Sequence, residues 1–178
     1  MAKFYSVGVG AGDGSYITLG ALRALEQADI IAVPVKKYGE KSTALEIIRK
    51  EFDTDKKEIS ELEFRMSGDT KIREESRRNS AEKIISTLKD GKDVAMITLG
   101  DVSVYSTCTY VHNAVKNAGF ELEIIPGITS FCAAADKAQI SLCEGNESVA
   151  IIPSLKSNLL EKYLSLIHIS EPTRLQLI

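Results

Sequence analysis

The fold is decided by the stretch VAMITLGD at residues 94–101, an apolar run of strand length that leads directly into a glycine and an aspartate. A short apolar run that ends at a turn residue is typical of a buried strand. Similar runs at residues 4–9, 30–33 and 122–125 predict further strands, and a shorter strand is expected near Ile59. Because longer amphipathic stretches separate these runs, the sequence predicts an α/β domain with a mostly parallel sheet.

The amphipathic stretches predict the helices. Ala81, Ile84, Ile85 and Leu88 form an i, i+3, i+4, i+7 stripe, which is typical of a helix with one buried face. We expect Pro34 to end the second strand, since proline cannot donate a ladder hydrogen bond. The expected helices are residues 19–28 with Thr18 as N-cap, a short helix opened by a Thr43–Glu46 capping box, a helix from near Lys71, Val104–Asn117 closed by Gly119, and a helix capped by Thr129 or Ser130 that runs through Ala138.

Composition and charge exclude several classes of function. The chain is 44% hydrophobic and 26% charged, as expected for a packed globular protein. Its 22 Lys and Arg residues nearly balance 25 Asp and Glu residues, which argues against a nucleic-acid partner. The apolar runs are too short to span a membrane, and residues 1–6 lack the apolar segment of a signal peptide, so a cytoplasmic location is expected.

The three cysteines, Cys108, Cys132 and Cys143, include no CxxC pair. Only His112 and His168 could join them as ligands, so the sequence predicts no metal site and no disulfide framework. We expect all three to be reduced and buried, as free cysteines usually are.

Glycine-containing loops follow three of the expected strands: residues 8–13 (GVGAGD), Gly100-Asp101 and residues 126–130 (PGITS). Open α/β sheets bind ligands beyond the carboxyl ends of their strands, and glycine lets a ligand or another backbone approach closely. The alternative is that the first loop is a strand-to-helix turn without a ligand. Likewise, Asp101 could be a helix cap, and Tyr105 could serve packing alone.

The first loop does not match the dinucleotide fingerprint GxGxxG. Asp13 or Ser15 stands where the third glycine is required. The end of the second strand, residues 33–35 (VPV), also lacks the acidic residue that would hold a ribose. NAD binding is therefore not expected.

In this order, the three loops resemble those of the tetrapyrrole methylases, a family of two-domain α/β enzymes that use S-adenosylmethionine. Within the family, the branch that methylates C20 of precorrin-2 or cobalt-precorrin-2 in cobalamin biosynthesis is most similar. The stretches that carry this likeness are Leu99–Thr107, Pro126–Phe131, Phe64–Met66 with Asp69, and Gly145–Glu147 leading to Ile151–Pro153. The chain departs from the family where prolines are usual, at Ala11, Gly14, Arg65 and Val102.

The resemblance implies roles for individual residues. The S-adenosylmethionine contacts would come from Leu99, Gly100, Asp101, Val104, Thr129 and Ser130. Gly10, Gly12 and Asp13 would border the substrate trough, and Asp101 or Tyr105 would assist proton removal. The family also implies a homodimer for the full-length protein. The open alternatives are another tetrapyrrole methylase, such as a uroporphyrinogen-III methyltransferase, and a non-catalytic nucleotide-binding module.

A basic stretch suits a substrate that carries many carboxylates. It contains Arg65, Lys71, Arg73, Arg77 and Arg78. Of these, Arg73 and Arg77 are expected on one helix face and are our candidate substrate-binding cations. The alternative is an ordinary solvated helix, because acidic residues are interleaved.

The pattern changes toward the end of the chain. We expect an N-terminal domain over residues 1–143, followed by the truncated start of a second α/β domain over 144–163. That start would comprise a turn at Gly145-Asn146, a strand at 149–152 and a helix at 155–163. Residues 164–178 are expected to be non-native, because one back-translation of 164–174 has the form of a transposase end used in sequencing libraries. A fragment of this kind is expected to be inactive.

Overall fold

The computed structural model describes residues 2–151, which fall into two compact units, Met1–Ile140 and Ser141–Ile178. The first unit contains one five-stranded sheet in the order β3-β2-β4-β1-β5, with every pair of neighbours parallel. This confirms the predicted α/β fold. Its main elements are β1 (Lys3–Gly8), α1 (Leu19–Gln27), β2 (Ile30–Val35), α2 (Thr43–Ile48), β3 (Glu58–Glu63), α3 (Thr70–Lys89), β4 (Val94–Thr98), α4 (Thr109–Asn117), β5 (Glu121–Ile125) and α5 (Ser130–Ala138).

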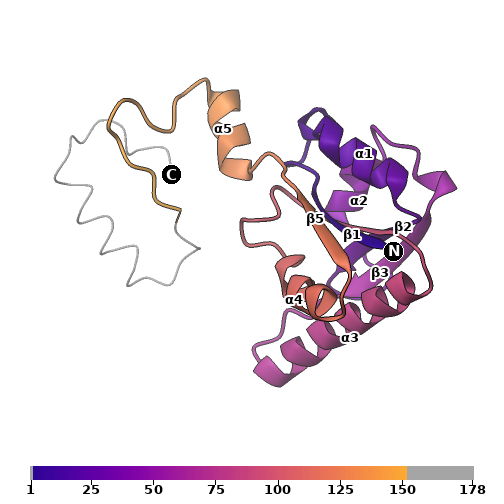
Figure 1. Ribbon diagram of the computed structural model, residues 1–178. Coiled ribbons are helices and arrows are strands. Elements are labelled where there is room, and N and C mark those ends of the chain that lie inside the picture. The colour runs from indigo at the N-terminus through magenta and orange to yellow at the C-terminus, as the bar shows by residue number, and fades with distance from the viewer. Residues whose placement is uncertain (1, 152–178) are drawn as a thin grey trace. The chain divides into compact units, whose positions relative to one another are not determined.

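Helices cover both faces of the sheet (Figure 1). One face packs against α1 and α2, and the other packs against α3 and α4. Successive residues of β1 serve opposite faces, since Phe4 packs toward α3 and α4 while Tyr5 packs toward α1 and α2. Burial on both faces explains why β4 is an uninterrupted apolar run instead of an alternating one.

Pro34 does not end β2, so that prediction is wrong. The strand continues through it to Val35, whose carbonyl accepts a hydrogen bond from Phe64 of the β3 side. The backbone groups of successive residues face alternate neighbouring strands, so the nitrogen of Pro34 faces the β4 side. The pairing of β2 with β4 stops at Ala32. The missing N–H therefore removes no ladder hydrogen bond.

Two predicted helix starts are also wrong. The N-cap of α2 is Ser42, whose hydroxyl accepts from Leu45 N, and Thr43 is already helical. The fourth helix begins at Thr109 instead of Val104, because residues 101–108 form turns in which Tyr105 has a left-handed φ of 48°. By contrast, Thr18 caps α1 as predicted.

Burial of the cysteines matches the prediction only for Cys108, because Cys132 and Cys143 are exposed.

Within residues 2–151, no helix is both long enough and apolar enough to cross a bilayer.

The described part of the second unit, residues 141–151, contains the predicted turn at Gly145-Asn146. Residues 149–151 are not a strand, so that prediction is wrong for those positions; no described strand pairs with them. Residue 152, the expected helix at 155–163 and the tail at 164–178 lie outside the described residues.

Candidate functional site

The loops after β1 and β4 are joined backbone to backbone. Gly10 and Gly100 form an antiparallel bridge, in which Gly10 N donates to Gly100 O at 3.2 Å and Gly100 N donates to Gly10 O at 2.8 Å. Both glycines have positive φ, 80° and 71°, a conformation that residues with a Cβ rarely adopt. The glycines of the two sequence motifs thus build one rigid connection at the carboxyl edge of the sheet.

The turn after β5 closes on the same place. A Cβ built on Gly127 would lie 2.2 Å from Gly100 O and 2.8 Å from Gly8 C, and one on Gly8 would lie 2.7 Å from both Gly100 O and Gly127 N. No side chain fits at either position. The three loops at the ends of β1, β4 and β5 therefore meet as bare backbone, and we call Gly8, Gly100 and Gly127 the glycine contact.

Asp101 connects two of these loops through its side chain. Its Oδ2 accepts a hydrogen bond from Gly127 N at 2.8 Å, and its Oδ1 accepts from Ser103 N at 2.8 Å and from the Ser103 hydroxyl. Burial by itself raises the pKa of this carboxyl. The hydrogen bonds from Ser103 and from the Gly127 and Val102 amides outweigh burial, so the pKa lies below the ordinary aspartate value. Asp101 does not cap α4, which begins eight residues later.

Thr129 and Ser130 sit at the start of α5. Thr129 occupies the N-cap position but makes no capping hydrogen bond. Its Oγ1 is buried and has no hydrogen-bond partner among the described residues. A buried hydroxyl without a partner is uncommon, and it is one of the observations that indicate a missing ligand. Ser130 is exposed.

Two expected cofactor contacts, Leu99 and Val104, and the catalytic candidate Tyr105 follow β4 at this edge. Leu99 is 51% exposed, Tyr105 is 69% exposed, and Val104 is half-buried. The Tyr105 hydroxyl has no hydrogen-bond partner in the described part of the chain. An exposed aromatic residue held in a left-handed conformation is the kind of backbone strain that gathers at functional sites.

Of the first-loop residues expected to border the substrate, Asp13 forms hydrogen bonds within the protein, whereas Gly12 is open to solvent. Asp13 accepts hydrogen bonds from Ser15 N at 3.0 Å and from Ser15 Oγ at 2.8 Å, both on Oδ1. These two bonds lower the pKa of the Asp13 carboxyl. Gly12 is exposed with a φ of 85°, and a Cβ there would meet no other atom within 4 Å. Part of this loop therefore stays open to solvent.

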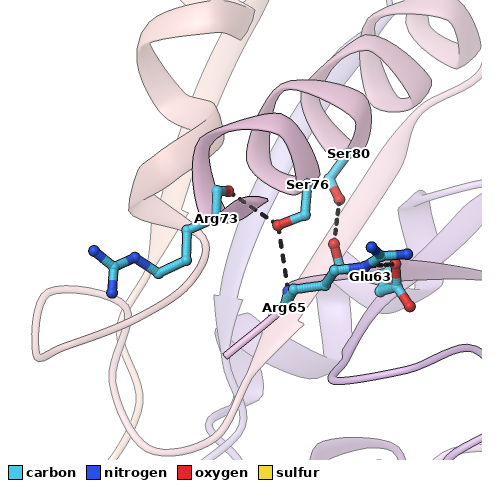
Figure 2. Close-up of polar contacts among 5 residues, drawn as sticks. All are labelled: Glu63, Arg65, Arg73, Ser76 and Ser80. Carbon is cyan, nitrogen blue, oxygen red and sulfur yellow. Dashed lines mark hydrogen bonds and ion pairs between the residues drawn. The ribbon is translucent and has the colours of Figure 1, made fainter. Parts of the chain in front are cut away.

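The basic stretch does not form one cationic patch. Arg73 donates to Ser67 O at 2.9 Å and to Thr70 Oγ1 at 3.1 Å, so it fastens the segment that precedes α3. The Arg77 guanidinium lies 3.5 Å from the centre of the Tyr110 ring on α4. Figure 2 shows Arg73 pointing away from Arg65, which pairs with Glu63 at 2.8 Å.

The family model for the Tetrapyrrole (Corrin/Porphyrin) Methylases matches residues 3–174. The chain belongs to this family. A Methanocaldococcus jannaschii relative named "Probable cobalt-precorrin-2 C(20)-methyltransferase" is 45% identical over 91% of this chain and 67% of its own length. A Salmonella typhimurium cobalt-precorrin-2 C(20)-methyltransferase is 33% identical over 84% of this chain and 62% of its own length.

Solved structures agree with the fold of this tetrapyrrole methylase. The crystal structure of the methyltransferase CobJ superimposes with a TM-score of 0.64 at 22% identity, covering 92% of this chain and 62% of that one. At that identity the likeness shows the fold alone. The chain spans about two thirds of the length of the curated relatives it matches, 67% and 62%.

Sequence reasoning missed a cluster of polar side chains between the sheet and the first turns of α4. His112 Nε2 lies 2.9 Å from Ser6 Oγ in the middle of β1, and Ser106 Oγ donates to Thr98 Oγ1 at 3.1 Å. Burial lowers the pKa of His112, with a smaller contribution from Lys116. The available signal was Ser6, a polar residue inside an otherwise apolar strand.

Proposed function

We propose that this tetrapyrrole methylase transfers a methyl group from S-adenosylmethionine to C20 of cobalt-precorrin-2. The observation that carries the proposal is the buried, unpartnered Thr129 hydroxyl beside the glycine contact, at the edge where the family likeness expects the cofactor. The names of the two curated relatives support the C20 position and the cobalt-containing substrate.

The residues at this edge fit S-adenosylmethionine. We propose that Leu99, Gly100, Val104, Thr129 and Ser130 hold it, together with the backbone of Asp101. The Thr129 hydroxyl is free to bond a polar atom of the cofactor, exposed Leu99 offers apolar contact, and a Cβ on Gly100 would have only Ile128 O within 4 Å. When bound, the cofactor supplies an electrophilic methyl group on a sulfonium.

The contribution of the chain is to position the reactants. The glycine contact fixes three backbone segments against one another, which reduces the orientational freedom that methyl transfer must otherwise lose. The substrate ring is electron-rich, so a strong base is not required to activate the carbon. Tyr105, which is exposed and has an unbonded hydroxyl, stays our candidate to assist proton removal.

The cofactor site can be tested with the product S-adenosylhomocysteine by titration calorimetry of the 178-residue chain and of Thr129→Val. We expect the wild type to bind and the variant to bind about tenfold more weakly, the equivalent of one hydrogen bond. Because this hydroxyl has no partner among the described residues, Thr129→Val should not reduce thermal stability. Absence of binding by the wild type would contradict the proposal and favour a module that does not use this cofactor.

Charge reversal tests how the carboxylate-rich substrate is held. We propose Arg73 and Arg77 as its cations, although both guanidinium groups already have partners in the protein. Lys36 and Lys37, just after β2, are exposed and form no ion pair in residues 2–151, so they are the matched alternative. If the proposal is right, Arg73→Glu with Arg77→Glu raises the Kd for cobalt-precorrin-2 more than Lys36→Glu with Lys37→Glu does.

The same assay with metal-free precorrin-2 decides whether cobalt is part of the recognised substrate. Preference for the metal-free ring would overturn the cobalt-containing assignment and leave C20 methylation intact.

We further propose a cytoplasmic location and a homodimer. Sedimentation of the purified protein tests the homodimer.

A further inference from the structure

We propose that Asp101 is a positioning residue, whose carboxylate fastens the loop after β4 to the turn after β5, and that it is not the base of the reaction. This inference rests on the proposed function, because it concerns how the same site is kept ready for its cofactor.

The first support is the geometry of the carboxylate. Oδ2 accepts a hydrogen bond at 2.8 Å from the amide of Gly127, which lies 26 residues further along the chain. Oδ1 accepts from the Ser103 amide at 2.8 Å and from the Ser103 hydroxyl. Donors from two loops therefore occupy both oxygens. A base needs a lone pair directed at the substrate proton, whereas the three donors on Asp101 all come from the protein and fix the direction of both oxygens.

The second support is that Asp101 provides a hydrogen-bond acceptor for the Gly127 amide. The glycine contact brings Gly127 so close to Gly8 and Gly100 that no side chain fits beside it, and Asp101 is the described partner of its N–H. A partly buried amide without an acceptor is costly, so the carboxylate stabilises this particular turn. Thr129, with its unpartnered hydroxyl, follows two residues later. The hydrogen bond from Gly127 to Asp101 thus fastens the turn two residues before that hydroxyl.

The third support is the ionisation of Asp101. Burial raises the pKa of the carboxyl, but the hydrogen bonds it accepts bring the net pKa below the ordinary value. A general base works best when its pKa is close to the working pH, and a pKa shifted downward makes Asp101 a weaker base. The same shift strengthens its role as an acceptor, because the ionised form is the one that bonds the Gly127 amide.

Asp101→Asn and Asp101→Ala separate the two roles. The asparagine keeps one carbonyl oxygen that can accept from the Gly127 amide, while the alanine keeps none. Ser103→Ala is the matched control, because it removes one donor to Oδ1 without touching the contact with Gly127. Each variant is compared with the wild type for methyl transfer, for the Kd of S-adenosylhomocysteine, and for hydrogen exchange at the Gly127 amide.

For a positioning residue we expect Asp101→Asn to keep kcat within about tenfold of the wild type, with an unchanged pH profile. Asp101→Ala should raise the Kd of S-adenosylhomocysteine by about tenfold or more and accelerate exchange at Gly127, and Ser103→Ala should do neither. In the wild type, the Gly127 amide shift should titrate with a midpoint below the ordinary aspartate pKa.

The opposite pattern overturns the proposal. A base predicts that Asp101→Asn lowers kcat by about 10²- to 10⁴-fold while the Kd and the Gly127 exchange stay at their wild-type values. If the wild type does not bind S-adenosylhomocysteine, the proposed function fails on its own, whereas absence of methyl transfer alone is what we expect of this chain and leaves the Kd and the Gly127 exchange as the deciding measurements. Exchange at Gly127 still decides whether Asp101 fastens the turn, and equal rates in the wild type and Asp101→Ala would reject that role.

Discussion

Two regions at the same edge of the sheet are held together in different ways. At the glycine contact, backbone atoms of three loops touch and leave no space for a side chain at Gly8 or Gly127. At the corner between β3 and α3 (Figure 2), side chains make the connections: Ser76 Oγ accepts from Arg65 N and donates to Arg73 O, and Ser80 Oγ donates to Glu63 O. A backbone contact leaves no space for an added atom, whereas a side-chain contact can be lost one hydrogen bond at a time.

The largest effect is expected from Gly127→Ala. The added Cβ would lie 2.2 Å from Gly100 O, and backbone atoms cannot move aside as the end of a side chain can. We expect the free energy of unfolding to fall by roughly 3 kcal/mol or more, as measured by chemical denaturation.

Gly68→Ala is the matched control for this change. Neither glycine has a positive φ, and a Cβ on Gly68 meets nothing within 4 Å. The two substitutions therefore differ in available space alone. Similar losses for both would mean that the three loops can separate without much cost, and the contrast between the two regions would fail.

A smaller effect is expected from Ser76→Ala at the corner. The substitution leaves Arg65 N without its acceptor, at a cost of about 1 kcal/mol in the free energy of unfolding. Ser86, exposed on the same helix, is the control, since Ser86→Ala gains the same helix propensity without losing this contact. Equal unfolding free energies for the two variants would show that the Ser76 hydroxyl does not stabilise the corner.

The smallest effect is expected from Arg77→Ala. Its guanidinium stacks on Tyr110 at 3.5 Å, an interaction worth about 0.5–1 kcal/mol at a partly exposed site. Arg78 is the control, because it is exposed and takes part in no such stack in the described residues. A double-mutant cycle with Tyr110→Leu isolates the pair, and a coupling energy of zero would remove it from the contacts that join α3 to α4.

The strands could be predicted because their signal is local. Residues of β1 and β4 are buried on both faces, so β4 is a continuous apolar run and β1 is interrupted within its buried part only by Ser6. The wrong predictions concern positions whose conformation depends on the strands and helices packed beside them. Pro34 is tolerated because β4 has stopped pairing beside it. The helix predicted from Val104 begins at Thr109, because the residues before it form turns, although Val102 and Cys108 in those turns are buried in the core with residues of α3 and α4.

The candidate site was predictable in its location and not in its contacts. Parallel strands bring their carboxyl ends to one edge, so glycine loops after three strands had to lie near one another. Nothing local indicates that Asp101 bonds the Gly127 amide, or that the Arg77 guanidinium stacks on Tyr110 of α4. Such pairings depend on distances between segments that are far apart in the chain.

The sequence alone determined the α/β class and the likeness to the tetrapyrrole methylases, and it selected the edge of the sheet where we propose the site, because hydrophobic period and glycine placement are properties of short segments. Only the tertiary structure decided which groups at that edge remain free. It joined both Asp101 oxygens to protein donors and left the Thr129 hydroxyl without a described partner. The physical reason is that hydrogen bonding depends on ångström distances and directions between loops, which only the packed sheet sets.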